Sequence, residues 1–184
     1  MRKVERSEIL GLGEYEAIRP HFRQRIMEEK RHRRIAIGDH MTLIFENHDT
    51  MLLQVQEMLR TERITNEKAI RHELDTYNDV VPGAGELSAT LMIEYVDPTL
   101  RREMATKLAT LRRHVHLVIG NSAHTAEFRD LDGEEPDRLP SVNYLRFHVG
   151  HVAGALRAGP TLIRFDHPDY RAEAPLPQGV REAL

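Results

Sequence analysis

The stretch "SATLMIEY", residues Ser88–Tyr95, is the most apolar strand pattern in the chain and decides how the fold is built. Its apolar residues do not alternate with polar ones, which predicts a strand that is covered on both faces. Glu94 stands out in this strand, because a buried carboxylate needs a cationic partner. The helix predicted at 49–62 carries an apolar stripe that requires such a surface. Arg60 follows Leu59 at the margin of the stripe, so we predict that Arg60 lies near Glu94 at the interface between helices and sheet.

Before this strand, the pattern "RRIAIGDHMTLIFEN" predicts a hairpin of two strands joined at Gly38-Asp39. Helices are predicted at 49–62 and, behind an Asn66 cap, at 66–78. Pro98 favours the first turn of a helix that runs to about residue 113. The remaining patterns are strands at 115–120, 124–130, 141–149 and 161–167, an exposed acidic loop at 130–140, a short helix at 151–159 and a last helix at 177–184.

Helices and strands alternate without a repeated βαβ rhythm, which predicts an α+β fold whose largely antiparallel sheet is packed by several helices. The 184 residues suit a single domain, 1–184, and no linker divides it. Within it, an N-terminal helical segment at 1–33 precedes an α+β body at 34–184. Pro20 is expected to break the N-terminal helix into two pieces, because proline lacks the amide donor and clashes one turn back.

The chain contains no cysteine, so it forms no disulfide, offers no thiol nucleophile and ligates no iron–sulfur cluster through thiolates. Its 26 basic and 29 acidic residues demand neither a nucleic acid nor a membrane as partner. The basic segment 19–34 has one aromatic residue, Phe22, which favours a solvated helix face over nucleic-acid binding. The first ten residues lack the apolar core of a signal peptide, and no run approaches the roughly 18 apolar residues of a membrane span. A cytoplasmic protein is therefore predicted.

Ionisable residues crowd the two helices at 56–79, "QEMLRTERITNEKAIRHELDTYND". One interpretation is a solvated face, because Arg71 is four residues from both Glu67 and Asp75, and such pairs stabilise exposed helices. The other is a pocket in which arginines bind a carboxylate or phosphate, while neighbouring glutamates compensate their charge when the pocket is empty. The candidate ligand-binding residues are Glu57, Arg60, Arg63, Glu73, Asn78 and Glu94.

Histidine is frequent, with 11 copies spread along the chain. His114 and His116 share a strand face, as two metal ligands would, but the sequence shows no third ligand nearby. A metal-dependent enzyme remains an alternative, in which imidazoles and carboxylates converge on iron, manganese or zinc. The ligands in that alternative are His40, Glu57, Glu73 and Glu94 or His167, with His40 and His167 as the assigned metal residues. The sequence identifies no cofactor, and a transition metal is compatible with it.

Several stretches that span nearly the whole chain together resemble a bacterial family catalogued as a domain of unknown function: "GDHMTLIFEN", "QEMLRTER", "ELDTYN", "ATLMIEY", "YLRF" and "DHPDY". Members of that family are single-domain proteins often encoded beside a rubrerythrin-like di-iron protein and an iron–sulfur protein of the heterodisulfide-reductase type. The resemblance implies a redox context and assigns no catalytic residue. The matching polar positions are His40, Glu46, Gln56, Glu57, Arg60, Glu62, Arg63, Glu73, Asn78, Glu94, Arg146, Asp166, His167 and Tyr170.

Together, these features predict an accessory or ligand-binding component of a redox system, with a polar Arg/Glu pocket between the two helices and the sheet. Iron–sulfur and rubrerythrin-like proteins are the partners that the resemblance implies. The metal-dependent enzyme with a His/carboxylate site is the alternative hypothesis.

Overall fold

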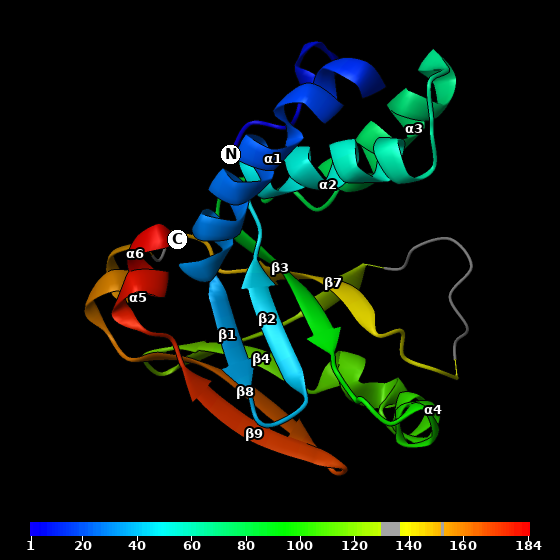
Figure 1. Cartoon of the computed structure of the whole chain (residues 1–184). Helices are drawn as coiled ribbons and strands as arrows, with labels where there is room; N and C mark the ends of the chain where they lie inside the picture. Colours follow the sequence, from blue (N-terminus) through cyan, green and yellow to red (C-terminus); the bar gives the residue numbers. More distant parts are fainter. Residues whose placement is uncertain (130–136, 152) are drawn as a thin grey trace.

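Two antiparallel sheets pack face to face, and a layer of helices lies at one end of them (Figure 1). The computed structural model describes residues 1–129, 137–151 and 153–184. The first sheet has the strand order β1 (Arg34–Ile37), β2 (Met41–Phe45), β3 (Glu86–Ile93), β7 (Val142–His148) and β6 (Glu127–Arg129). The second has the order β5 (Ser122–Thr125), β4 (Val115–Ile119), β8 (Thr161–His167) and β9 (Tyr170–Pro175). The predicted single α+β domain with antiparallel sheets is confirmed.

The helical layer consists of α1 (Leu12–Arg31), α2 (His48–Thr61) and α3 (Glu67–Asn78). Three further helices are α4 (Pro98–Lys107), α5 (Ala153–Ala158) and α6 (Gln178–Ala183), and two 3-10 turns are η1 (Arg6–Glu8) and η2 (Ala109–Arg113). The helix predicted to reach residue 113 therefore ends at Lys107 and is followed by η2. Among the described residues, no helix combines the length and the apolar character that crossing a bilayer requires.

The first hairpin turns at Gly38, which adopts φ 64°, a left-handed conformation that glycine enters without steric cost. Ile37 and Met41 pair across the turn, so the predicted hairpin is confirmed. A Cβ atom at position 38 would lie 2.5 Å from the Tyr170 hydroxyl, which donates a hydrogen bond of 2.6 Å to the Ile37 carbonyl. This contact joins the hairpins of the two sheets, so the turn and the close approach both require glycine.

The main core fills the space between the two sheets. Phe45, Leu91 and Phe147 of the first sheet and Leu117 and Phe165 of the second are each at most 2% exposed. Full burial of a side chain of this size contributes about 1.5–3 kcal/mol. This core is therefore the main source of the free energy that holds the sheets together.

The central strand β3 is covered on both faces over residues 88–91, as its composition predicts. Ala89 and Leu91 are fully buried in the main core. On the opposite face Ser88 and Thr90 are 2% and 9% exposed, and Thr90 lies directly across from Tyr144 of β7.

A smaller core joins the helical layer to this face of the sheet. Leu59 of α2 and Leu74 of α3 pack in one cluster with Tyr144, so α2 and α3 cover the face that carries Thr90. The strand β3 ends at Ile93. Glu94 lies beyond its end with an exposed side chain, and the prediction of a buried Glu94 is wrong.

Helix α1 continues through Pro20 for 20 residues, so the predicted break is wrong. Proline removes one amide donor, but Tyr15 and Ile26 are both fully buried and anchor the two halves of the helix. Tertiary packing of an amphipathic face supplies most of the stability of a helix in a protein. Here it outweighs the local cost of proline.

Two further differences concern strands. The residues of β9 were not predicted as a strand, because its inward positions include the small Ala172 and Ala174, which give a weak apolar period. Pro175 is tolerated there because β9 is an edge strand. The strand predicted at 124–130 is divided between β5 and β6 at Ala126. Its last residue and positions 131–136 of the predicted acidic loop lie outside the described residues.

We predict that Pro20→Ala stabilises the protein. Alanine restores the hydrogen bond to the Glu16 carbonyl and removes the clash, and the gain exceeds the entropy that proline removes from the unfolded chain, leaving about 1–2 kcal/mol. Urea unfolding measures the change. Pro98→Ala is the matched control, since Pro98 occupies the first turn of α4, where no amide donor is needed. A Pro20→Ala variant that is less stable than wild type would contradict the prediction.

Candidate functional site

Helices α1 and α2 are joined by a cluster centred on Glu57. The Tyr15 hydroxyl donates a hydrogen bond of 2.5 Å to Glu57 Oε1. Arg19 grips the same carboxylate with Nε at 2.7 Å from Oε1 and Nη2 at 2.9 Å from Oε2. Arg23 lies 3.8 Å from Oε2. Tyr15, Arg19 and Arg23 stand at spacings of four residues, so all three point from one face of α1 toward α2.

The protonation states in this cluster are fixed near neutral pH. The hydrogen bond from Arg19 lowers the pKa of Glu57 against the opposing effect of burial, and Tyr15 and Arg23 add to the lowering. Burial first, and then the hydrogen bond to Glu57, raises the pKa of Tyr15. Near neutral pH the carboxylate is therefore ionised and the phenol is protonated. The arrangement positions groups and gives neither partner a pKa suited to general acid or base catalysis.

A cleft of about 120 Å³ opens beside this cluster, between α1, α2 and the N-terminal segment. Its lining residues are Glu8, Leu10, Tyr15, Ile18, Phe22, Leu52 and Gln56. The volume is below the roughly 300–1,000 Å³ of sites for drug-sized ligands. It fits a single apolar side chain of a partner better than a cofactor.

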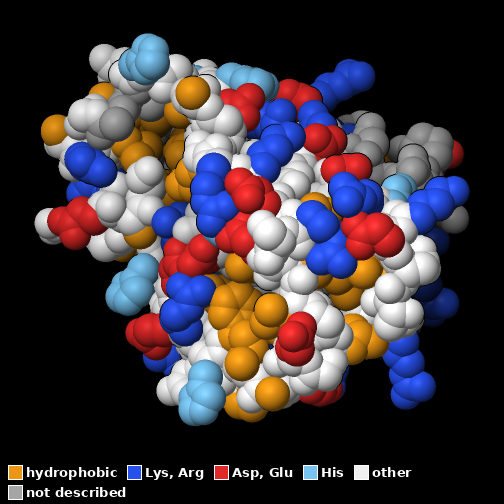
Figure 2. Space-filling model, turned by 90° about the horizontal axis from the view of Figure 1, so that it is seen from above, with side chains coloured by type: hydrophobic (Ala, Val, Ile, Leu, Met, Phe, Trp, Pro, Cys, Tyr) orange, Lys and Arg blue, Asp and Glu red, His pale blue; other side chains and the backbone are white. Residues whose placement is uncertain are grey.

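Two arginines form a basic rim beside the cleft, and each is paired with a carboxylate, Arg23 with Glu57 and Arg25 with Asp49. Arg23 and Arg25 of α1 have side chains that are 49% and 56% exposed, and the Arg25 guanidinium lies 5.3 Å from the centre of the Phe22 ring. Ile18 is 43% exposed at the cleft wall. Figure 2, which views the helical layer from above, shows hydrophobic side chains gathered among such basic and acidic ones. An apolar centre with a charged rim is the usual anatomy of a protein interface.

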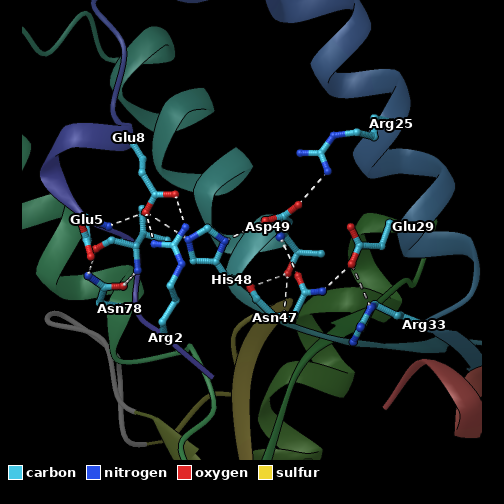
Figure 3. A network of polar contacts seen from close by, with 12 residues as sticks. Arg2, Glu5, Glu8, Arg25, Glu29, Arg33, Asn47, His48, Asp49 and Asn78 are labelled. Atoms are coloured by element: carbon cyan, nitrogen blue, oxygen red, sulfur yellow. Dashed lines mark hydrogen bonds and ion pairs between the residues drawn. The ribbon is translucent and has the colours of Figure 1, made fainter.

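A polar network ties the N-terminal segment, α1 and α2 together (Figure 3). Arg2 makes two hydrogen bonds of 2.7 Å to Glu8. The His48 ring lies between two carboxylates, with Nε2 at 3.1 Å from Glu8 and Nδ1 at 2.7 Å from Asp49. Arg25 completes the chain of contacts at 2.7 Å from Asp49. The hydrogen bond from Arg2 is the main cause that lowers the pKa of Glu8 to about 2.

The structure separates Arg60 from Glu94. Arg60 Nε pairs with Glu16 of α1 at 2.8 Å, whereas Glu94 accepts a hydrogen bond of 2.6 Å from the Thr42 hydroxyl and lies 3.7 Å from Arg34. The predicted Arg60–Glu94 pair is wrong. Successive helix positions differ in direction by about 100°, so the residue after Leu59 points sideways to α1 and away from the sheet.

Arg63 and Asn78 have structural contacts. Arg63 adopts φ 54° just beyond α2, while the Ile64 amide bonds the Leu59 carbonyl at 2.9 Å and the Arg63 amide bonds the Arg60 carbonyl at 3.3 Å. This pattern is a Schellman cap. Asn78 is 9% exposed and binds the backbone of the N-terminal segment. A ligand-binding role for either residue stays a prediction.

Glu73 is a predicted site residue whose charge is disfavoured by its surroundings. Its side chain is half-buried on α3, and burial, followed by the charge of Glu62, raises its pKa. It lies on a different helix from the Glu57 cluster. Of the six predicted ligand-binding residues, Glu57 and Arg60 both contact α1 from α2. The other four lie elsewhere in the fold.

The two assigned metal residues have unrelated surroundings. His40 stacks on Tyr95, with ring centres 4.3 Å apart. His167 is 2% exposed; the Asp169 amide donates to its Nδ1 at 3.1 Å, and its Nε2 lies 2.9 Å from the Thr110 hydroxyl. Both ring nitrogens of His167 are engaged by protein groups, whereas Glu57 is held by Tyr15 and Arg19 of α1, and a metal site that joins His167 and Glu57 stays a prediction. Within the described ranges, no group of three or more histidine, aspartate or glutamate side chains is arranged to hold a metal ion.

One further carboxylate lies between the helical layer and the sheet. Glu46 is 3% exposed, and its Oε1 accepts a hydrogen bond of 2.6 Å from Thr90. In the part of the chain that the structure describes, Glu46 Oε2 and the Ser88 hydroxyl have no hydrogen-bond partner. The two residues are neighbours across β2 and β3, since the Glu46 amide bonds the Ser88 carbonyl at 2.8 Å.

Tyr15 and Arg19 are the functional residues that sequence reasoning missed. Tyr15 was not singled out from the sequence, and Arg19 entered only as part of the basic segment 19–34. Their spacing of four residues is a signal that both lie on one helix face. Their partner Glu57 is 38 residues beyond Arg19, a separation that no helical spacing predicts.

A double-mutant cycle should show that Arg60 is coupled to Glu16 and not to Glu94. The Arg60–Glu16 pair is partly exposed, with side-chain exposures of 35% and 51%, so we expect a coupling of about 0.2–1 kcal/mol. The coupling energy between Arg60 and Glu94 should lie within about 0.5 kcal/mol of zero. Urea unfolding of the alanine variants provides the measurement. A larger Arg60–Glu94 coupling would refute the arrangement.

Glu8→Gln should destabilise the protein in a pH-dependent way. The pKa of Glu8 is lowered from 4.5 to about 2 in the folded protein, so its contribution to stability is fully present above pH 4.5 and is lost as the pH falls to about 2. Urea unfolding at pH 7, 4 and 2 should give a difference from wild type that shrinks as the pH falls. Arg2→Met should weaken the same dependence, because it removes the main cause of the shift. A difference that stays constant with pH would exclude this role for Glu8.

Two of three comparisons with known proteins give matches, and the third gives none. The search of curated proteins finds no match. A solved structure, described as a novel protein of unknown function from Burkholderia pseudomallei K96243, is 32% identical to this chain, with a TM-score of 0.92. The alignment covers 100% of this chain and 97% of that one. The family model described as "Protein of unknown function (DUF3501)" matches residues 3–184. The chain therefore belongs to this family.

Proposed function

We propose that the protein is a binding component of a redox system that docks an acidic partner protein at the α1–α2 cleft. The observation that carries the proposal is the cleft itself, an apolar hollow of about 120 Å³ walled by Ile18 and Phe22, with the partly exposed ion pairs of Arg23 and Arg25 beside it. Interfaces of this anatomy concentrate their binding energy in one or a few anchors at the centre. The partner contributes one apolar anchor and surrounding carboxylates.

The locked cluster behind the cleft supports binding. With Glu57 ionised and Tyr15 protonated near neutral pH, the cluster holds α1 against α2 and keeps the wall of the cleft in place. Arg60 reinforces the same joint through Glu16. The two predicted site residues on this joint, Glu57 and Arg60, therefore act by positioning α1, which carries Ile18 and the basic rim.

The redox context of the proposal comes from the resemblance to a family encoded beside rubrerythrin-like and heterodisulfide-reductase-type proteins. Those two protein types are accordingly the proposed partners, in the cytoplasm. Acidic partners fit the surface electrostatically, because the segment 19–34 holds seven basic residues against two acidic ones. Long-range attraction of this kind raises the association rate and weakens with salt.

Ile18→Glu should abolish most of the binding without unfolding the protein. The change places a charge at the exposed wall of the apolar cleft, so the affinity for the iron–sulfur or rubrerythrin-like partner should fall at least about tenfold. Leu100→Glu is the matched control, because Leu100 is 39% exposed on α4, outside the helical layer. Isothermal calorimetry with each purified partner, in oxidised and reduced forms, measures the affinity, and circular dichroism checks the fold.

Two outcomes would overturn the proposal. One is equal affinity of the Ile18→Glu and Leu100→Glu variants for a partner that binds wild type. The other is failure of wild-type protein to bind either partner in any oxidation state. Binding that does not weaken between low and high salt would contradict the role of the basic rim.

A further inference from the structure

The first ten residues are held by two side-chain amides. Asn78 at the end of α3 accepts a hydrogen bond from the Val4 amide at 2.8 Å and donates one to the Val4 carbonyl at 2.9 Å. Gln56 of α2 repeats the pattern, accepting from the Leu10 amide at 2.6 Å and donating to the Leu10 carbonyl at 3.3 Å. Each amide thus satisfies both backbone groups of one residue. Contacts of this kind recognise an extended backbone without reading its side chains.

Two side chains of the segment fill the smaller core. Val4 and Ile9 are 3% and 6% exposed, and they cluster with residues of α2 and α3. At the surface Arg6 pairs with Glu67 of α3, Nη2 to Oε2, at 2.9 Å. The helices therefore form a groove with two amide clamps, two apolar sites, the Arg6–Glu67 ion pair and the contact of His48 with Glu8.

The segment keeps its own shape through internal contacts. Arg2 binds Glu8, the Glu5 amide bonds Glu8 Oε2 at 2.9 Å, and the Ile9 amide bonds the Arg6 carbonyl at 3.2 Å. It joins the rest of the chain at Gly11, the N-cap of α1. Figure 1 shows this dark blue part of the chain at the outside of the helical layer. A preshaped segment beside a glycine is suited to move as one body.

We propose that residues 1–10 exchange between two copies of this chain, so that the groove of each copy binds the segment of the other. Every contact of the groove is then re-formed with the same residues of the other copy. Exchange of an identical element is a low-cost route to a dimer for this reason. The segment lies 46 and 74 residues in sequence from its clamps Gln56 and Asn78. No contact within α1 therefore has to break for it to move.

Exchange changes the α1–α2 cleft as well. Glu8 and Leu10 of the segment line that cleft. In the exchanged dimer each cleft is completed by the other copy. The inference is independent of the proposed function, because it rests on the groove contacts alone and is tested without a redox partner.

Cross-linking between two single-cysteine variants tests the exchange. The chain has no cysteine of its own, so Arg6→Cys in one preparation and Glu67→Cys in a second, size-tagged preparation give one reactive thiol each. The two are unfolded together in urea, refolded at high concentration and treated with a short bifunctional thiol reagent. A covalent heterodimer whose yield rises with protein concentration is the expected result, since residue 6 then lies on the groove of the other chain.

Glu173→Cys replaces Glu67→Cys in the control mixture. It lies on β9 of the second sheet, away from the groove, and should give at least about fivefold less heterodimer. Equal yields from both mixtures, or no heterodimer at any concentration, would overturn the proposal. Sedimentation of refolded wild-type protein is a second readout, in which a purely monomeric species at high concentration also counts against exchange.

The hinge supplies a variant that leaves the groove intact. Gly11 has φ −62°, which matches the fixed φ of proline near −65°. Gly11→Pro stiffens the pivot but also removes the hydrogen bond of 3.1 Å from the Gly11 amide to Glu14 Oε2, so circular dichroism must first show that α1 is intact. We expect the heterodimer yield to fall at least about threefold with Gly11→Pro in both chains. An unchanged yield would show that movement about Gly11 does not produce the dimer.

Discussion

The two-sided burial of β3 is the constraint on which the rest of the structure depends. One face of the strand places Leu91 in the core between the sheets, and the other places Thr90 under the helical layer. A strand covered in this way needs a layer on each side, so the second sheet and the α2–α3 pair are both required. Without the helices, the face that carries Ser88 and Thr90 would be open to water.

Burial of the helix-facing side of β3 costs free energy, because this side carries polar residues. Thr90 satisfies one oxygen of Glu46, but Glu46 Oε2 and the Ser88 hydroxyl are unpartnered among the described residues. Leaving a buried polar group unsatisfied costs about 1–3 kcal/mol. The apolar contacts of α2 and α3 with Tyr144 must outweigh that cost, and the Glu57–Arg19 and Arg60–Glu16 pairs then join α1 to α2.

The sequence was sufficient for most elements and for the fold class, because helical and strand periods are local properties. It was insufficient where tertiary packing overrode a local rule. Pro20 remains inside α1 because buried Tyr15 and Ile26 hold both halves. Glu94 was assigned to a strand that ends one residue earlier, and element ends depend on the neighbouring strand, which the local pattern does not contain.

The candidate site shows the same division. Glu57 was singled out correctly as part of a polar cluster on α2, yet its partners are on α1 and were invisible to spacing arguments within one helix. Arg60 was paired with Glu94 because its neighbour Leu59 faces the core. The Arg60 side chain points toward α1 because each helix residue is rotated by about 100° from the one before it. Predicting Glu16 as its partner would have required the position of α1, which the sequence pattern does not contain.

The two kinds of contact in the helical layer have different consequences for the protein. Ion pairs hold α1 to α2, and an ionised carboxylate is required for each of them. Neutral amides of Gln56 and Asn78 hold the N-terminal segment, and they bind backbone groups without bringing a buried charge. Because such clamps do not titrate, acid acts on the segment through the carboxylates of Glu8 and Glu67 and leaves its two amide clamps in place. The segment is thus fixed at its clamps by contacts that any copy of the same backbone satisfies equally well.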